Sequence, residues 1–342
     1  MAHPRIDPLK TLRSQIHGKK AGFLLGAGSS YLGGNGYPLA NGLWTELQSR
    51  IDPKDATRIS KAMNRSGAGL EDALDALDKD PSRPFPLRER IGDAVAKVLG
   101  ARNPPLDTHR RFVRGLAKRR DCRVPVLTLN YDPLVELAGA LEECLVFDGF
   151  IGVYKAAFKP ASFNYRVGMP STRRGKPVTE LLHGIIDLIK LHGSLGWYQL
   201  DGRIERRDPA LELPVGCRRL LIPPQRRKHQ DTATPPYSNL WSEFRGLLAN
   251  DGPRLLNRLI CVGYGFRDEH VNAILRAALN RHNFTLVILS KSLDDRVYAE
   301  WARSNRAIVV TETRSTILNN EVDPIPKAWS FEWLAEEIAY HA

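Results

Sequence analysis

The stretch KAGFLLGAGSSYLGGNGYPLANG, residues 20–42, decides the fold. Its apolar run at 21–25 is typical of a strand buried on both faces. The run leads directly into GAGSS at 26–30, where two glycines and small residues allow a tight turn that a ligand can approach closely. A strand that ends in exposed backbone N–H groups can hold a phosphate or pyrophosphate. The stretch therefore predicts a strand, a nucleotide-binding turn and a following helix.

This turn is an incomplete dinucleotide fingerprint. The spacing Gly26-x-Gly28-x-x-Tyr31 lacks the third glycine of that motif. Glu46 lies where the fingerprint places a ribose-binding acid, but the apolar residues around it recur at helical spacing and put Glu46 on the solvated side of a helix. A plain glycine-rich turn between strand and helix is the alternative interpretation.

The bulk composition is that of an ordinary globular protein. Of 342 residues, 42% are hydrophobic and 26% charged, and no apolar stretch is long enough to cross a bilayer or to act as a signal core. We therefore expect a cytoplasmic protein without a membrane partner. The four cysteines include no CxxC pair, so neither a zinc site nor a disulfide framework is expected. The net charge of +12 favours polyanionic partners, although a solvated surface is the default interpretation of each basic cluster.

Apolar runs alternate with helical patterns along most of the chain. Four further strands are predicted at 124–129, 185–191, 258–262 and 284–289. This alternation predicts an α/β fold, a Rossmann-like parallel sheet covered by helices on both faces, with a helical insertion and a smaller irregular insertion. We expect one domain over 1–342, with the core at 20–150 and 185–320, the helical insertion at 43–120, and a basic irregular insertion or lid at 151–184.

Four predicted strands end in polar or glycine-rich loops: GAGSS (26–30), TLNYD (128–132), KLHGS (190–194) and VGYGF (262–266). In open α/β sheets, ligands bind beyond the carboxyl ends of the strands. The order of these motifs resembles the sirtuin family, and most of all the sirtuin-like NAD hydrolases of bacteria, many of which act in defence against phage. The resemblance spans about residues 20 to 292 and includes TLNYDPLVE (128–136), IPP (222–224) and VGYGFRDEH (262–270).

The resemblance implies roles for individual residues and NAD as the substrate. His192 resembles the general base that contacts the nicotinamide ribose, and Asn130 the residue that orients that ribose and a water near the anomeric carbon. Asp132 resembles the acid that reads the nicotinamide carboxamide. The implied NAD-binding residues are Gly26, Ala27, Gly28 and Ser29 around the pyrophosphate, Asp132 at the carboxamide, Gly263 and Tyr264 at the ribose, and Ser290 at the adenosine end.

The chemistry of the cleaved bond agrees with these roles. Breaking the bond between nicotinamide and ribose builds positive charge on the sugar, and nicotinamide leaves as a neutral base without a strong acid. A histidine can accept a proton from the attacking water near neutral pH. Deacylating sirtuins also carry a four-cysteine zinc module and a GIPDFRS-like stretch, and this sequence contains neither. No metal is expected, and NAD hydrolysis is favoured over lysine deacylation.

The sequence therefore predicts an NAD+ glycohydrolase that yields ADP-ribose and nicotinamide, gated as an NAD-depleting effector of antiviral defence. The resemblance also implies a homo-oligomer and a separately encoded DNA translocase, ATPase or nucleic-acid-guided partner. A nucleotide-sensing or nucleic-acid-associated subunit without turnover, a protein ADP-ribosyltransferase and a deacylase remain alternatives. His192 at a strand end, and Asn130 and Asp132 as turn and cap residues, also have plain structural interpretations. Four other histidines are expected at the surface or at caps: His109, His229, His270 and His282.

Overall fold

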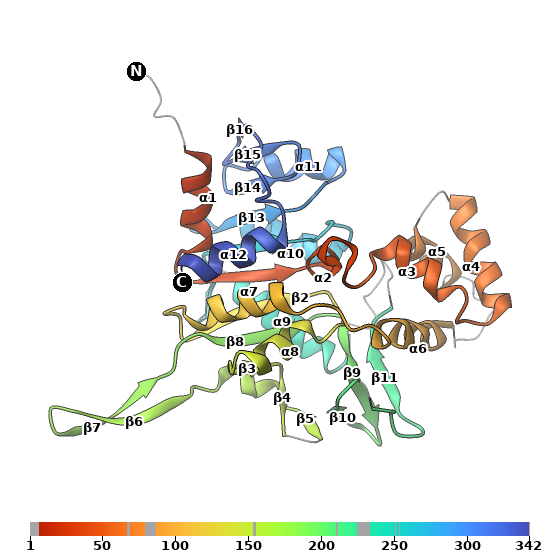
Figure 1. Cartoon of the computed structure of the whole chain (residues 1–342), viewed down its shortest axis with the longest axis horizontal. Coiled ribbons are helices and arrows are strands. Elements are labelled where there is room, and N and C mark those ends of the chain that lie inside the picture. Colours follow the sequence, from red (N-terminus) through yellow and green to blue (C-terminus); the bar gives the residue numbers. More distant parts are fainter. Residues whose placement is uncertain are drawn as a thin grey trace.

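A nine-stranded sheet forms the centre of the protein (Figure 1). The computed structural model describes residues 7–66, 69–78, 87–152, 155–209, 211–223, 233–249, 251–252 and 254–341. The strand order is β16-β15-β14-β13-β12-β1-β2-β8-β3. The strands are β1 Ala21–Leu25, β2 Arg123–Thr128, β3 Val146–Phe147, β8 Ile185–Lys190, β12 Arg258–Val262, β13 Thr285–Leu289, β14 Ala307–Val310, β15 Ser315–Ile317 and β16 Asn320–Val322. Within this sheet, β14, β13, β12, β1, β2, β8 and β3 are parallel, and β15 and β16 add antiparallel pairs at one edge.

The order of the parallel strands defines a switch point in the sheet. From β1 the chain adds β2 and then β8 on one side, and it later adds β12, β13 and β14 on the other side of β1. This is the doubly wound arrangement, in which ligands bind where the winding direction reverses. The reversal lies between β1 and β12. The predicted Rossmann-like α/β fold is confirmed.

Helices cover both faces of this sheet because its strands are apolar on both sides. In β1, Phe23 and Leu25 enter the core on one face, and Leu24 enters the core on the other. The first face is covered by α1 Pro8–Ile16, α7 Asp107–Ala117, α8 Leu134–Leu141 and α12 Phe331–His341. The second face is covered by α9 Tyr237–Leu248, α10 Glu269–Leu279 and α11 Asp295–Ala302. None of the helices in the described ranges is long and apolar enough to span a membrane.

The helical insertion has a core of its own and projects to the right of the sheet in Figure 1. Beyond α2 Ala27–Tyr31 and η1 Leu32–Gly34, it contains α3 Ala40–Leu47, α4 Pro53–Ser66, α5 Leu70–Asp78 and α6 Leu87–Gly100. The range predicted for this insertion, 43–120, also includes α7. The structure places α7 against the sheet instead, because Phe112 and Leu116 pack into the core of the first face.

Two smaller sheets lie below the main sheet in Figure 1. One has the order β11-β9-β10-β5-β4 and consists of β4 Phe150–Ile151, β5 Ala156–Phe158, β9 Gly193–Leu200, β10 Arg203–Arg206 and β11 Arg218–Leu221. The other is a two-stranded ribbon, β6 Gly168–Arg173 and β7 Lys176–Leu181, which follows η2 Pro160–Asn164. The segment 151–184, predicted to be irregular, therefore contains regular antiparallel strands.

Candidate functional site

The turn after β1 packs directly on the turn after β12, at the switch point of the sheet. Gly28 N donates a hydrogen bond to Gly263 O at 2.9 Å, and Gly26 N donates to Val262 O at 3.0 Å. A Cβ atom on Gly26 would lie 2.5 Å from Gly263 O. A Cβ on Gly263, whose φ is +63°, would lie 2.5 Å from Ser29 N. Glycine is therefore required here so that the two turns can touch.

This packing changes the expected role of the first turn. The backbone N–H groups of Gly26 and Gly28 donate to the β12 loop, and Ser29 N donates to Gly26 O at 3.0 Å. The expectation that this turn offers exposed N–H groups to a phosphate is wrong for these three residues, because each N–H already has an acceptor inside the protein. Ala27 is the exposed residue of the turn. Glu46 forms an ion pair with Arg102.

Asn130 joins the end of β2 to the same turn. Its Nδ2 donates to Gly26 O at 2.9 Å and to Ser30 Oγ at 2.8 Å, and it lies 3.3 Å from Ser29 Oγ. Its backbone N–H donates to Thr128 Oγ1 at 3.0 Å. The side chain is thus fixed in orientation while the residue remains partly exposed. The structure brings Asn130 together with Gly26 and Ser29, as predicted.

Asp132 is buried between this turn and the start of α8. Its carboxylate accepts from the backbone N of Leu134, the first residue of α8, at 3.2 Å and from the hydroxyl of Ser30, whereas the N-cap residue of α8 is Pro133. Burial raises the pKa of Asp132, and the charge of Lys190 and the hydrogen bond from Ser30 oppose the rise. Asp132 therefore binds the first turn of α8 and also lies beside the glycine turn.

Lys190 supports the loop that carries Asn130 and Asp132, a role that the sequence did not reveal. Its side chain is fully buried at the end of β8, where Nζ donates to Asp132 O at 2.5 Å and to Glu136 Oε1 at 2.7 Å. A buried ammonium group needs such partners, because an unpaired charge in the interior is costly. The available signal was a lysine at the end of a buried strand whose other residues, apart from Asp187, are apolar.

His192 reaches across the strand ends to Asp268, which follows β12. His192 Nε2 lies 3.1 Å from Asp268 Oδ2, and both side chains are only 6% exposed. Strands β8 and β12 are separated by β2 and β1, a distance of about 14 Å at ordinary strand spacing. The two loops must therefore arch over the carboxyl ends of β1 and β2 to meet. The predicted convergence of the four loops is present, and it is completed by Asp268, a residue that was not among the predicted site residues.

Asp268 is itself held in several ways. It is the N-cap of α10, where Oδ1 accepts from His270 N at 3.1 Å, and helix N-termini stabilise a carboxylate. The hydroxyl of Tyr264 donates to Asp268 O at 3.1 Å and accepts from Asp268 N at 3.2 Å. Trp241 of α9 lies beside the imidazole of His192, with ring centres 6.4 Å apart, and its indole N–H donates to Leu191 O. Tyr264, predicted to line a ribose, thus also fixes the partner of His192.

Ser290 lies at the same edge but one strand further out. Its hydroxyl donates to Ser292 O at 3.0 Å, and its loop contacts the β12 turn through the bond from Gly263 N to Leu289 O. The second histidine–glycine pair, His183-Gly184, precedes β8 and so lies at the opposite end of that strand from His192. His109 was expected at the surface or at a cap, but it is buried against Phe331, and burial lowers its pKa to about 3.

The described residues include no group of three His, Cys, Asp or Glu side chains that could hold a metal ion. Two of the predicted positions lie outside the described residues, namely His229 and Pro224 of the IPP motif.

The fold and the strand-end site define a Rossmann-like protein of the kind that binds a ligand at the switch point of its sheet. Comparison with protein families matches residues 124–309, more than half of the chain, to the SIR2-like domain. The chain therefore belongs to the SIR2-like domain family. Asn130, His192 and Asp268 all fall within the matched range, and the glycine turn after β1 lies before it.

Two other comparisons, with curated sequences and with solved structures, add no further family or function. A search of curated protein sequences finds no match. Among solved structures, a Sir2 homologue in complex with NAD matches over 100% of this chain and 96% of its own, with 15% identity and a TM-score of 0.42.

Proposed function

We propose that this protein hydrolyses NAD+ to ADP-ribose and nicotinamide at the carboxyl ends of β12, β1, β2 and β8. The observation that carries the proposal is the contact between His192 and Asp268, which spans the end of β1 where Asn130 holds the glycine turn. A histidine and a fixed amide at the switch point of a Rossmann-like sheet supply a proton acceptor and an orienting group for water. Membership of the SIR2-like family supports the same interpretation.

The dinucleotide is proposed to lie across the switch point. Its pyrophosphate faces the exposed Ala27 of the glycine turn, and Gly26, Gly28 and Ser29 shape that turn through hydrogen bonds within the protein. The nicotinamide ribose lies between Asn130 and His192. The remaining proposed contacts are Asp132 with the carboxamide, Gly263 and Tyr264 with the ribose, and Ser290 with the adenosine end.

The reaction breaks the C–N bond between the anomeric carbon of ribose and nicotinamide. The bonding electrons leave with nicotinamide, which departs as a neutral base, and positive charge develops on the sugar. Asn130 orients a water toward the anomeric carbon, and His192 takes a proton from that water as the new C–O bond forms. Asp268 acts as a positioning residue, because it holds the imidazole and stabilises the imidazolium that results.

We further propose a cytoplasmic homo-oligomer that depletes NAD during antiviral defence and is gated by a separately encoded partner. The gating partner is proposed to be a DNA translocase, an ATPase or a nucleic-acid-guided protein. Unchecked NAD loss is toxic, so the isolated chain should turn over slowly. Light scattering tests the oligomer, and high constitutive activity in a lone monomer contradicts the gating.

The test combines NAD binding with product analysis. With enzyme in molar excess over NAD, even slow turnover releases measurable nicotinamide. We expect release by the wild type, its loss in His192→Ala and Asn130→Ala, and full retention in His282→Ala, which alters an exposed histidine. Calorimetric binding of NAD without nicotinamide release would instead indicate a nucleotide-sensing subunit. Mass spectrometry of a modified or deacylated target would indicate transferase or deacylase activity. Activity that survives both site substitutions overturns the assignment.

A further inference from the structure

The ribbon formed by β6 and β7 projects from the body of the protein, and no third strand pairs with it among the residues that the structure describes (Figure 1). Each strand has six residues, which corresponds to a length of about 20 Å. A two-stranded hairpin is marginally stable on its own in water. Residues 155–184, which contain the ribbon, carry six lysines and arginines and a single acidic residue. A large part of the net positive charge of +12 is therefore carried on this projection.

The tip of the ribbon concentrates three cations. Arg173 and Lys176 are directly opposite partners in the ladder, and Arg174 lies in the turn between them. Arg174 and Gly175 have φ of +50° and +74°, which gives a tight two-residue hairpin turn. All three cations are exposed, and within the described ranges none of them has an acidic partner. Like charges that face each other across a ladder are destabilising, so this tip is suited to meet an anion.

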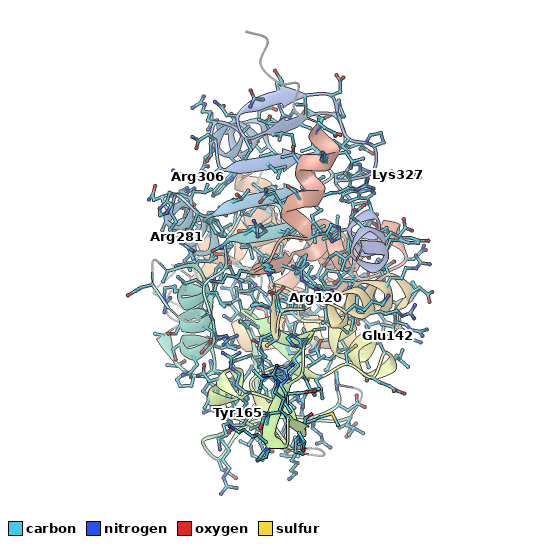
Figure 2. All side chains as sticks on the ribbon, turned by 90° about the vertical axis from the view of Figure 1, so that its left-hand side faces the viewer. Arg120, Glu142, Tyr165, Arg281, Arg306 and Lys327 are labelled. Carbon is cyan, nitrogen blue, oxygen red and sulfur yellow. The ribbon has the colours of Figure 1, made fainter. Side chains whose placement is uncertain are left out.

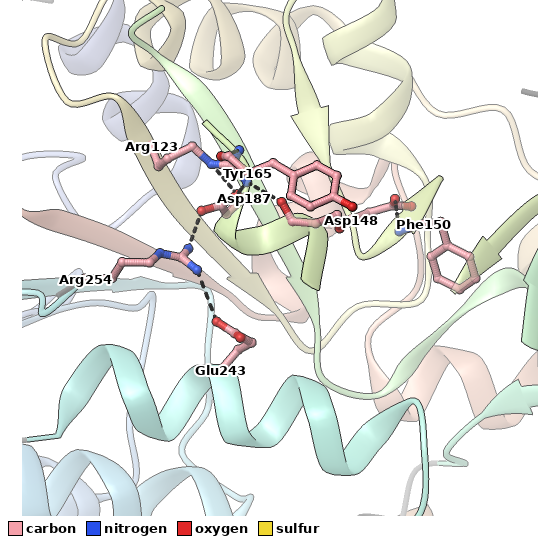
Figure 3. Close-up of polar contacts among 8 residues, drawn as sticks. Arg123, Asp148, Phe150, Tyr165, Asp187, Glu243 and Arg254 are labelled. Atoms are coloured by element: carbon pink, nitrogen blue, oxygen red, sulfur yellow. Dashed lines mark hydrogen bonds and ion pairs between the residues drawn. The ribbon is translucent and has the colours of Figure 1, made fainter. Parts of the chain in front are cut away.

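The ribbon leaves the body from a fixed base rather than from a loose loop. On the entering side, Arg123 donates to Tyr165 O at 2.9 Å and to the buried carboxylate of Asp187 (Figure 3). Arg254 holds the other oxygen of Asp187 and also pairs with Glu243 of α9 at 3.2 Å. Breaking one pair of a buried ionic network leaves an uncompensated buried charge, which costs free energy. The network therefore keeps the base of the ribbon in one arrangement.

The returning side of the ribbon is held as well. His183 Nδ1 donates to Arg120 O at 2.6 Å, and Gly184 N donates to Asp121 O at 2.8 Å. Figure 2 looks onto the side from which the ribbon projects and labels Arg120 and Tyr165, one from each side of this base. The tip is thus presented at a set position relative to the sheet.

We propose that this ribbon binds the phosphate backbone of B-form DNA with its tip in the major groove. That groove is about 12 Å wide and admits a two-stranded ribbon. Single strands are bound by stacking their bases on aromatic rings, and residues 168–181 contain no aromatic residue. The major groove of double-stranded RNA is too narrow and deep for side chains to read. The same lack of apolar or aromatic residues at 172–177 argues against a membrane.

The test measures binding of a fluorescent 20-base-pair DNA duplex by anisotropy between about 50 and 200 mM salt. Each phosphate contact adds about 0.9 to the slope of log affinity against log salt. The variant Arg173→Ala/Arg174→Ala/Lys176→Ala should therefore lower that slope by about 3 and weaken binding most at low salt. Arg173→Lys/Arg174→Lys keeps the charge and should retain most of the affinity.

A matched control removes three exposed arginines elsewhere. Arg203→Ala/Arg296→Ala/Arg303→Ala changes the net charge equally and should leave the slope nearly unchanged. Circular dichroism checks that each variant is folded, and nicotinamide release should be the same as in the wild type, which keeps this test independent of the NAD reaction. Equal effects of the two triple variants, or tighter binding of a single strand or an RNA duplex, would overturn the proposal.

Discussion

Replacing Asp268 by asparagine removes one charge from the site and leaves its shape. Asp268 Oδ2 faces His192 Nε2 at 3.1 Å, while Oδ1 caps α10. Asparagine caps a helix about as well as aspartate, so the fold should lose little stability. What the substitution removes is a buried hydrogen bond to a charged group, which contributes about 1.5–3 kcal/mol. If that contribution is made when His192 becomes an imidazolium, kcat falls by about 10- to 150-fold.

The assay separates positioning from binding. Nicotinamide release at saturating NAD should fall in Asp268→Asn, whereas KM should change by less than about threefold because Asp268 is not proposed to contact NAD. Because a carboxylate only accepts hydrogen bonds, we expect Nε2 of His192 to carry the proton in the wild type, and nitrogen-15 NMR should report that single tautomer. The asparagine side chain can offer its amide or its oxygen, so a mixture of tautomers is expected in the variant.

Two results would refute this reasoning. If kcat of Asp268→Asn equals that of the wild type, the carboxylate does not assist proton transfer. If the melting temperature falls as far in Asp268→Asn as in Asp268→Ala, which also loses the cap at about 1 kcal/mol, asparagine does not preserve the start of α10, and the premise that the substitution leaves the shape of the site is wrong.

Three further predictions concern the packing of the strand-end loops and the helices α7 and α8 that cover the sheet. Gly263→Ala should weaken NAD binding, measured by calorimetry, and lower the free energy of unfolding by about 1–3 kcal/mol, measured by thermal melting, because the new Cβ would meet Ser29 N. An affinity and a stability equal to those of the wild type would contradict the packing of the two loops. Arg114 and Arg110 hold the pKa of Glu142 at about 2, so the ion pairs stabilise the fold above about pH 4.5 and are lost as pH falls toward 2. Because the arginines are exposed, Glu142→Gln should lower the free energy of unfolding by about 1 kcal/mol at pH 7 and by much less at pH 2.5. An equal loss at both pH values would refute this prediction. His109 stays neutral in the folded protein down to about pH 3, so as pH falls below about 6.5 the unfolded chain gains a proton that the folded protein does not. The melting temperature of His109→Leu should therefore fall less between pH 7 and 5 than that of the wild type. Equal falls would contradict the lowered pKa of the buried His109.

The sheet and its strand-end loops were predictable because short, continuous stretches of the sequence determine them. Runs such as 21–25 and 259–262 are free of polar side chains and fully buried, which indicates strands covered on both faces, and each run ends at a glycine turn. The carboxyl ends of parallel strands share one edge, so the positions of Asn130 and His192 followed from the strand pattern once the fold class was chosen.

The contacts that complete the site were not predictable in the same way. Asp268 lies 76 residues from His192 in the chain, and a helix cap explains its local sequence fully. The meeting of the two depends on how loops arch over intervening strands, which no periodicity records. Gly26 and Gly28 likewise suggested a phosphate-binding turn, but their N–H groups are used by the β12 loop, a partner more than 230 residues away.

The most direct measurement is a single-turnover reaction with NAD in water enriched in oxygen-18, analysed by mass spectrometry. Hydrolysis at the proposed site predicts nicotinamide and ADP-ribose in equal amounts, with one oxygen-18 atom at the anomeric hydroxyl, and no products from His192→Ala. Intact NAD after prolonged incubation with an excess of folded wild-type protein and its activating partner, or products formed equally by His192→Ala, would contradict the account.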